Sequence, residues 1–187
     1  MNDFFSALPK LETERLILRK LMLSDALNVF QFTKNPVITK FLTWDAHKSE
    51  KHTIAFLKRV LNKYEAGEPS QWAIVLKETN VVIGISGFIN HYKEHKKAEI
   101  AYIMSEKYSG KGYMTEALRK VLDAGFSILK LHRIEAKCEK DNFASEKVMQ
   151  KLGMQFEGCF RDFLFIKGKY RDFKFYSILQ KHFSSNK

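Results

Sequence analysis

The most constraining feature of this sequence is an alternating strand that leads into a glycine-containing loop and a long amphipathic helix. Apolar side chains alternate from Ala98 to Ser105 (AEIAYIMS), as in a half-buried strand. Ser109-Gly110-Lys111-Gly112 follows, and residues 113–130 then place apolar side chains on one helical face. Glycines let backbone N–H groups approach a ligand, and a helix N-terminus has unpaired N–H groups and a positive dipole end. The pattern predicts an anion site suited to a diphosphate.

The loop differs from two widespread phosphate-binding motifs. A Walker A loop would need glycine where Ser105 stands, and a dinucleotide-binding GxGxxG motif would need glycine where Thr115 stands. Taken alone, the loop is equally well explained as a glycine turn that caps a helix.

The remaining periodicity predicts a mixed α/β domain spanning 1–187, with a loose tail over 183–187. Strands are expected over 13–19, 71–77, 81–91, 98–105, 132–139, 154–166 and 170–181, and helices over 24–35, 49–67, 113–130 and 142–152. Residues 37–48 are ambiguous. The order contains one central β-α-β unit and lacks the strict alternation of a doubly wound sheet.

A second motif favours the interpretation of the loop as a ligand-binding site. Asn142 begins a short helix, where it is suited to accept backbone N–H groups as a cap. Together, the stretch from Ala98 to Gly158 resembles the acetyl-CoA-binding core of the GNAT superfamily of N-acetyltransferases. The family pattern [QR]xxGx[GA] is matched at both glycines of the loop, but Lys107 stands in place of Gln or Arg. The pattern N-x-x-[SA]…G-[FM] is matched by Asn142, Ser145 and Gly153-Met154.

Four separated motifs narrow this resemblance to the ribosomal-protein alanine N-acetyltransferase (RimJ/RimL) branch. They are T-E-R-L-x-L-R (13–19), G-K-G-Y-x-T-E-A (110–117), N-x-x-S (142–145) and G-x-Y-x-D-x-x-x-Y (168–176). The resemblance therefore covers nearly the whole chain. It implies the GNAT fold, a largely antiparallel splayed sheet flanked by helices, and direct transfer of an acetyl group from acetyl-CoA to an amine.

The resemblance also implies which residues bind the cofactor. The diphosphate would lie on the loop and the start of the helix, and the acetyl and pantetheine portion on backbone N–H groups at the end of the preceding strand. The residues concerned are Ile103, Met104, Ser109, Gly110, Lys111, Gly112, Tyr113, Met114 and Asn142. No Cys/His cluster has zinc spacing, so no metal is expected.

Two residues are the candidates for proton transfer. Glu99 lies in a strand start similar to that of GNAT enzymes that use a glutamate as base, although a Glu that pairs with Lys96 or Lys97 would look the same. Another acidic side chain near the substrate cleft is the alternative base. Many GNAT enzymes place a tyrosine acid at the position of Met149, which has no proton to donate. Ser145 is therefore the candidate that protonates the leaving sulfur, with a first-turn helix serine as the alternative reading and Tyr176 as a second candidate acid.

The chain carries 32 Lys and Arg against 21 Asp and Glu, a net charge of +11. An anionic cofactor accounts for a small part of this excess. The basic clusters 93–97 and 167–171 predict either solubility alone or docking to an acidic partner, ribosomal RNA included. The acceptor is expected to be a protein N-terminus or a small-molecule amine such as a polyamine or an antibiotic. A non-catalytic CoA-binding module is the alternative.

Two cysteines, no signal-peptide pattern and no long apolar run predict a cytoplasmic protein without a membrane span. A homodimer is left open.

Overall fold

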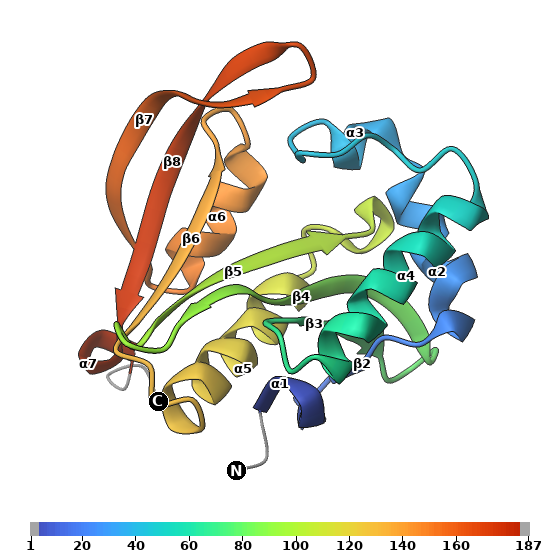
Figure 1. Cartoon of the computed structure of the whole chain (residues 1–187), viewed down its shortest axis with the longest axis horizontal. Helices are drawn as coiled ribbons and strands as arrows, with labels where there is room; N and C mark the ends of the chain where they lie inside the picture. The colour runs from blue at the N-terminus through green and yellow to red at the C-terminus, as the bar shows by residue number, and fades with distance from the viewer. Residues whose placement is uncertain (1–3, 184–187) are drawn as a thin grey trace.

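The computed structural model describes residues 4–183, which form an α/β domain around one eight-stranded sheet (Figure 1). The strands are β1 (Leu11–Glu12), β2 (Leu16–Lys20), β3 (Gln71–Leu76), β4 (Val81–Tyr92), β5 (Lys97–Met104), β6 (Arg133–Glu139), β7 (Gln155–Ile166) and β8 (Lys169–Leu179). The helices are α1 (Phe4–Ala7), α2 (Ala26–Thr33), α3 (Pro36–Thr39), α4 (Glu50–Glu65), α5 (Tyr113–Ser127), α6 (Phe143–Lys151) and α7 (Gln180–Phe183), with 3-10 turns η1 (Leu23–Asp25) and η2 (Glu106–Tyr108).

The sheet opens in its middle. Its order is β1-β2-β3-β4-β5-β6-β8-β7, and every neighbouring pair is antiparallel except β5 and β6. These two strands pair only over Lys97–Glu99 and Arg133–Glu135 and then diverge, as Figure 1 shows. The largely antiparallel, splayed sheet that the family resemblance implies is thereby confirmed. Beyond Glu99, the facing edges of β5 and β6 are left unpaired with each other.

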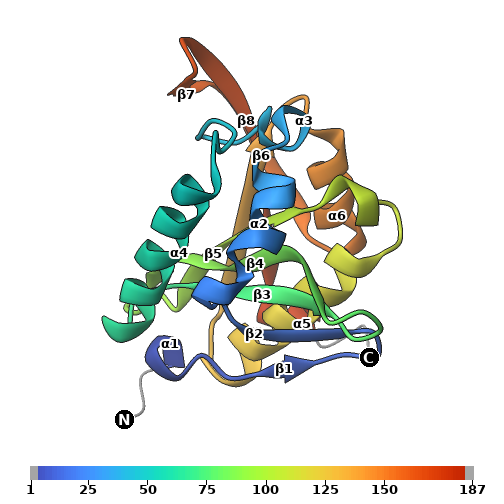
Figure 2. The same ribbon diagram turned by 90° about the vertical axis from the view of Figure 1, so that its right-hand side faces the viewer.

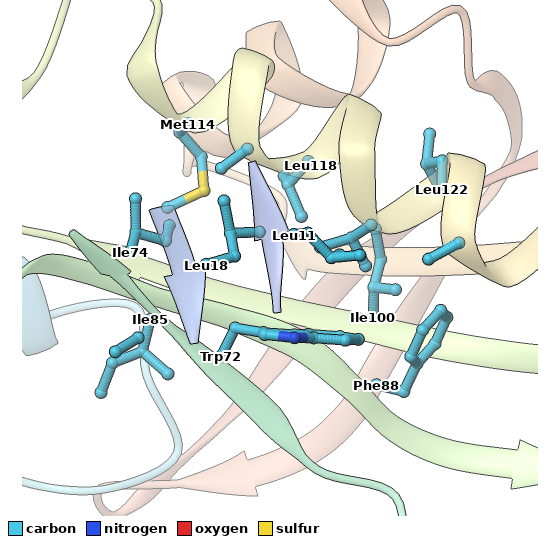
Figure 3. Packing of buried hydrophobic residues seen from close by; sticks show 14 of the residues in the cluster. Leu11, Leu18, Trp72, Ile74, Ile85, Phe88, Ile100, Met114, Leu118 and Leu122 are labelled. Atoms are coloured by element: carbon cyan, nitrogen blue, oxygen red, sulfur yellow. The ribbon is translucent and has the colours of Figure 1, made fainter. Parts of the chain in front are cut away.

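Helices cover both faces of the sheet. Figure 2 shows α2 and α4 on one side and α5 and α6 on the other. The buried stripe of α5, which includes Met114, Leu118 and Leu122, packs against Leu18 and Ile100 of the sheet (Figure 3). Complete burial of a side chain of this size contributes about 1.5–3 kcal/mol. This packing fixes α5 to the sheet, and so fixes the position of the loop that precedes it.

Local contacts explain where element boundaries differ from the predicted ones. β2 begins at Leu16, three residues late, because the Oγ1 of Thr13 accepts the Leu16 N–H at 3.0 Å and holds the chain in a turn. α5 ends at Ser127, three residues early, and Lys130 then adopts a left-handed conformation (φ 54°) of the kind that follows helix ends.

Short elements account for the other differences. The ambiguous stretch contains α3, which begins after Asn35; the Asn35 side chain accepts the Val37 N–H at 2.9 Å. The sequence pattern did not indicate α1, β1 or α7. Of the predicted loose tail, Phe183 ends α7 and residues 184–187 lie outside the described residues.

Candidate active site

A cleft of about 490 Å³ lies beside the open edge of β5. Its walls come from β5, η2, the glycine loop, the first residues of α5, α6 and the segment around α3. The predicted residues that line it are Ile103, Met104, Ser109, Gly110, Gly112, Tyr113, Met114, Asn142 and Ser145. Two predicted residues, Glu99 and Lys111, are not in its lining. The structure therefore brings most of the predicted cofactor residues together in one hollow.

The glycine loop presents backbone to this cleft. Gly110 and Gly112 have φ values of 77° and 81°, which side-chain-bearing residues rarely adopt. α5 begins directly after Gly112, and no side chain caps its N-terminus. First-turn N–H groups without a capping side chain and the positive end of the helix dipole form a site for an anion. Lys111 instead turns its carbonyl toward Arg15, which donates to it at 3.2 Å.

The last residues of β5 present a strand edge. Ser105 donates its N–H to Ile83 of β4 at 2.9 Å, and the antiparallel register pairs Ile103 with Ile85 and Met104 with Gly84. Because hydrogen-bonded and non-hydrogen-bonded pairs alternate along such a ladder, the Ile103 N–H points toward β4 and the Met104 N–H points toward the open side. Met104 is therefore the predicted residue whose N–H faces the space that β6 leaves.

Ser145 is held from two directions. Its backbone N–H donates to Asn142 Oδ1 at 3.1 Å, so Asn142 caps α6. Its Oγ lies 2.7 Å from the hydroxyl of Tyr102 on β5, which also donates to the Ser145 carbonyl at 3.1 Å. Burial raises the pKa of Tyr102, so this hydroxyl keeps its proton at neutral pH. The sequence did not single out Tyr102, which appears there only as one apolar position of an alternating strand.

Glu99 lies at the last residue pair that joins β5 to β6. Its carboxylate accepts an ion-paired hydrogen bond from Lys137 of β6 and a 2.9 Å bond from the Asn90 side chain of β4. The expected partners Lys96 and Lys97 are not the ones it takes. Glu99 and Tyr102 are three residues apart on β5, so their side chains lie on opposite faces of the sheet. Glu99 and Ser145 are thus not in contact.

Further titratable side chains surround Ser145 on its own face. Tyr176, the alternative acid, donates its hydroxyl to Glu146 at 2.7 Å, and Lys174 ion-pairs with the same carboxylate at 2.8 Å. Burial and the Glu146 charge raise the pKa of Tyr176 to about 12. Burial also raises the pKa of the Cys138 thiol to about 11, so the thiol stays protonated. Tyr176 is hydrogen-bonded to Glu146 and does not line the cleft.

Two lysines that the sequence analysis missed line the cleft. Lys147 and Lys151 stand four residues apart on α6, hence on one helical face. Their spacing after the Asn142 motif was the available signal. The cluster 167–171, by contrast, is used partly within the fold: Lys167 donates to the Thr39 carbonyl at 2.7 Å, and Arg171 ion-pairs with Glu139 at 2.6 Å.

Comparison with known proteins places this site in a family. Residues 15–155 match the model of the acetyltransferase (GNAT) domain. The chain belongs to the GNAT acetyltransferases. An uncharacterised N-acetyltransferase, p20 of Bacillus licheniformis, is 35% identical over 93% of this chain and 98% of its own length. A GNAT-family acetyltransferase structure from Bacillus anthracis superposes with a TM-score of 0.84 at 29% identity, over 92% of this chain and 99% of that one.

The relatives whose names state an acceptor fall into two classes, those that acetylate a protein and those that acetylate a polyamine. The structure of RimL, a ribosomal L7/L12 α-N-protein acetyltransferase in complex with coenzyme A, shares the fold with a TM-score of 0.82 at 23% identity, over 91% of this chain and 98% of that one. The spermidine N(1)-acetyltransferase of Escherichia coli is 37% identical over 84 residues, 45% of this chain and 44% of its own length. This GNAT N-acetyltransferase therefore has a settled reaction class, and its acceptor has to be argued from its own residues.

Within residues 4–183, no group of three or more His, Cys, Asp and Glu side chains is arranged to hold a metal ion. The same described part of the chain contains no helix that is both long and apolar enough to cross a membrane.

Proposed function

We propose that this protein transfers the acetyl group of acetyl-CoA directly to the N-terminal α-amine of a protein. The observation that carries the proposal is the composition of one cleft. It combines a helix N-terminus with no side-chain cap, an open strand edge and a serine hydroxyl paired with a buried tyrosine.

The residues of the cleft fit acetyl-CoA, whose thioester supplies the activated acetyl group. The loop Ser109–Gly112 and the first N–H groups of α5 would hold the diphosphate, with Lys147 and Lys151 adding positive charge. The Met104 N–H, on the open edge of β5, would hold the pantetheine amides and the acetyl carbonyl. The RimL structure, which has the same fold, contains coenzyme A.

Ser145 is proposed to deliver a proton to the departing sulfur. The Tyr102 hydroxyl and the Asn142 cap fix the direction of the Ser145 Oγ. As the C–S bond breaks and negative charge develops on sulfur, the Oγ donates its proton to the sulfur and regains one from water, while the Tyr102 hydroxyl keeps its own proton and holds the Oγ in place. General acid catalysis of this kind contributes about 10²–10⁴-fold to a rate.

Glu99 is proposed to remove the proton from the amine, through a water molecule, on the opposite face of the open sheet. Lys137 and Asn90 fix the position of its carboxylate. How much this base has to do depends on the fraction of the amine that is already neutral. An α-amine has an ordinary pKa near 7.8, so about one molecule in seven is already neutral at pH 7, whereas only about one alkyl amine in 2,500 is.

Charge adds a second reason to prefer a protein N-terminus over a polyamine. A net charge of +11 repels a polycation, and the acidic side chains Glu99 and Glu139 already have cationic partners. The spermidine enzyme that aligns with part of the chain makes a polyamine the competing acceptor to be tested. Ribosome docking, a cytoplasmic location and a homodimer remain predictions from the sequence.

The test measures release of free CoA thiol with acetyl-CoA and a panel of acceptors. The panel pairs peptides with a free N-terminus against the same peptides blocked at that end, and adds spermidine and an aminoglycoside. We expect turnover with free N-termini at rates at least about tenfold above those with spermidine. Turnover of spermidine alone would overturn the α-amine assignment. Binding of acetyl-CoA without turnover of any amine would favour a non-catalytic module.

A further inference from the structure

Arg15, the residue that precedes β2, is ion-paired and contacts the glycine loop from outside the cleft. Arg15 donates its Nε to Glu116 Oε2 at 2.7 Å, and its Nη2 lies 2.6 Å from the same oxygen. Its Nη1 donates to the Lys111 carbonyl at 3.2 Å, and its guanidinium lies 4.4 Å from the centre of the Tyr113 ring. One side chain therefore touches the loop, the first residue of α5 and the first turn of α5.

Thr13 completes this network. Its hydroxyl donates to Glu116 Oε1 at 2.6 Å, and the Arg15 backbone N–H donates to the same oxygen at 3.1 Å. Burial disfavours the charged form of Glu116, but these hydrogen bonds and the Arg15 charge outweigh it, and the pKa of Glu116 is lowered. Two motifs about a hundred residues apart in the sequence, 13–19 and 110–117, are thus parts of one structure.

The network has an electrostatic consequence for the cleft. Glu116 is a full negative charge in the first turn of α5, beside the N-terminus that would receive a diphosphate. A negative charge there competes with an anionic ligand for the same helix end. Arg15 cancels this charge at contact distance, and an Nη2 atom packed 3.5 Å from where a Gly112 Cβ would lie keeps positive charge directly behind the loop.

We propose that Arg15 is the positioning residue of the diphosphate loop, which it shapes through Lys111 and Gly112 and keeps electropositive by neutralising Glu116. Arg15 does not line the cleft, so it acts through the loop rather than on the ligand. The inference rests on the proposed use of acetyl-CoA. It assigns to the T-E-R motif a role in cofactor affinity.

The first experiment measures the Kd of CoA by calorimetry for the wild type, Arg15→Ala, Glu116→Gln and the double variant. Arg15→Ala is expected to weaken binding about 30-fold, because it leaves the Glu116 charge uncompensated. The double variant is expected to recover to within about fivefold of the wild type, because the repelling charge is gone. Arg133→Ala is the matched control, because Arg133 is also an ion-paired arginine, bonded to Glu135 and Glu157, but at the start of β6, away from the loop.

The second experiment locates the effect on the diphosphate. Acetyl-pantetheine carries the thioester without the nucleotide and its phosphates. We expect Arg15→Ala to raise the KM for acetyl-CoA by at least about tenfold while leaving kcat/KM for acetyl-pantetheine within about twofold of the wild type. Arg15→Lys, which restores charge but not the fork of donors, is expected to recover affinity only in part.

Two results would overturn the inference. One is equal loss with acetyl-CoA and acetyl-pantetheine, which would indicate general damage to the fold. The other is a double variant no better than Arg15→Ala. A wild-type protein that fails to bind CoA at all would instead remove the proposed function.

Discussion

The hydroxyl of Tyr102 lies 2.7 Å from the Oγ of Ser145, and this contact joins the two halves of the open sheet. Tyr102 belongs to β5, at the edge of the first half, and Ser145 to α6, which packs against β6 in the second half. Because β5 and β6 no longer pair at this level, a side-chain bond replaces the missing ladder. The residue proposed to protonate the thiolate is therefore also a structural link across the opening.

Ser145→Ala is expected to lower kcat about 100-fold and to leave the Kd of CoA within about threefold of the wild type. Tyr102→Phe is expected to lower kcat by about tenfold, because Ser145 keeps its Asn142 cap but loses the hydroxyl that orients its Oγ. Single-turnover kinetics and calorimetry separate the two quantities. Ser127→Ala, which removes a serine bonded only to its own helix, serves as control. Unchanged turnover in Ser145→Ala would remove the serine from the mechanism.

Glu99→Gln tests the base through its dependence on pH. At pH 7 the variant is expected to lose about 100-fold in kcat/KM toward an α-amine. The loss should shrink toward pH 9, because the free α-amine is then already neutral and needs no base. Glu135→Gln, which alters the directly paired residue of β6, is the control. A loss that stays constant from pH 6.5 to pH 9 would show that Glu99 acts through structure alone.

Much of this fold follows from the periodicity of the sequence, whereas the contacts within the site do not. The stripe of α5 and the alternation of β5 were readable because each buries one face against a single neighbour. The partner of Glu99 was not readable, because Lys137 comes from a strand 38 residues later whose register depends on the β-α-β crossover. Tyr102 was missed for a related reason. An alternating strand shows which side chains share a face, but it does not show that the Tyr102 hydroxyl contacts the Ser145 hydroxyl.

Alanine substitutions at two glycines are expected to lower the stability of the protein by different amounts and for different reasons. A Cβ at Gly87 would lie 2.5 Å from the Gln71 Cα and 2.6 Å from the Ser70 carbonyl oxygen, which are backbone atoms that have no room to yield. We expect Gly87→Ala to lower the free energy of unfolding by about 3 kcal/mol. A Cβ at Gly110 would meet nothing, so Gly110→Ala carries only the strain of its φ of 77°, about 1 kcal/mol.

The same pair separates stability from binding. Urea unfolding measures the first quantity, and titration with CoA measures the second. We expect Gly110→Ala to weaken CoA binding by more than its small effect on stability suggests, because the loop backbone has to turn its N–H groups toward the ligand. A strongly destabilised Gly110→Ala with normal CoA affinity would contradict this assignment of the loop.

Glu146 predicts how the second half of the sheet responds to acid. Hydrogen bonds from Lys174 and Tyr176 hold the pKa of Glu146 below its ordinary value of 4.5. Because the folded protein binds this proton less readily than the unfolded chain, the stabilisation is complete above the unfolded pKa and is lost as the pH falls through the folded one. The difference in Tm between the wild type and Glu146→Gln should therefore be positive at pH 7 and shrink below about pH 4. Glu94→Gln, at an exposed turn, should show no such trend, and an equal difference at pH 7 and pH 3 would mean that Glu146 stabilises α6 by packing rather than by charge.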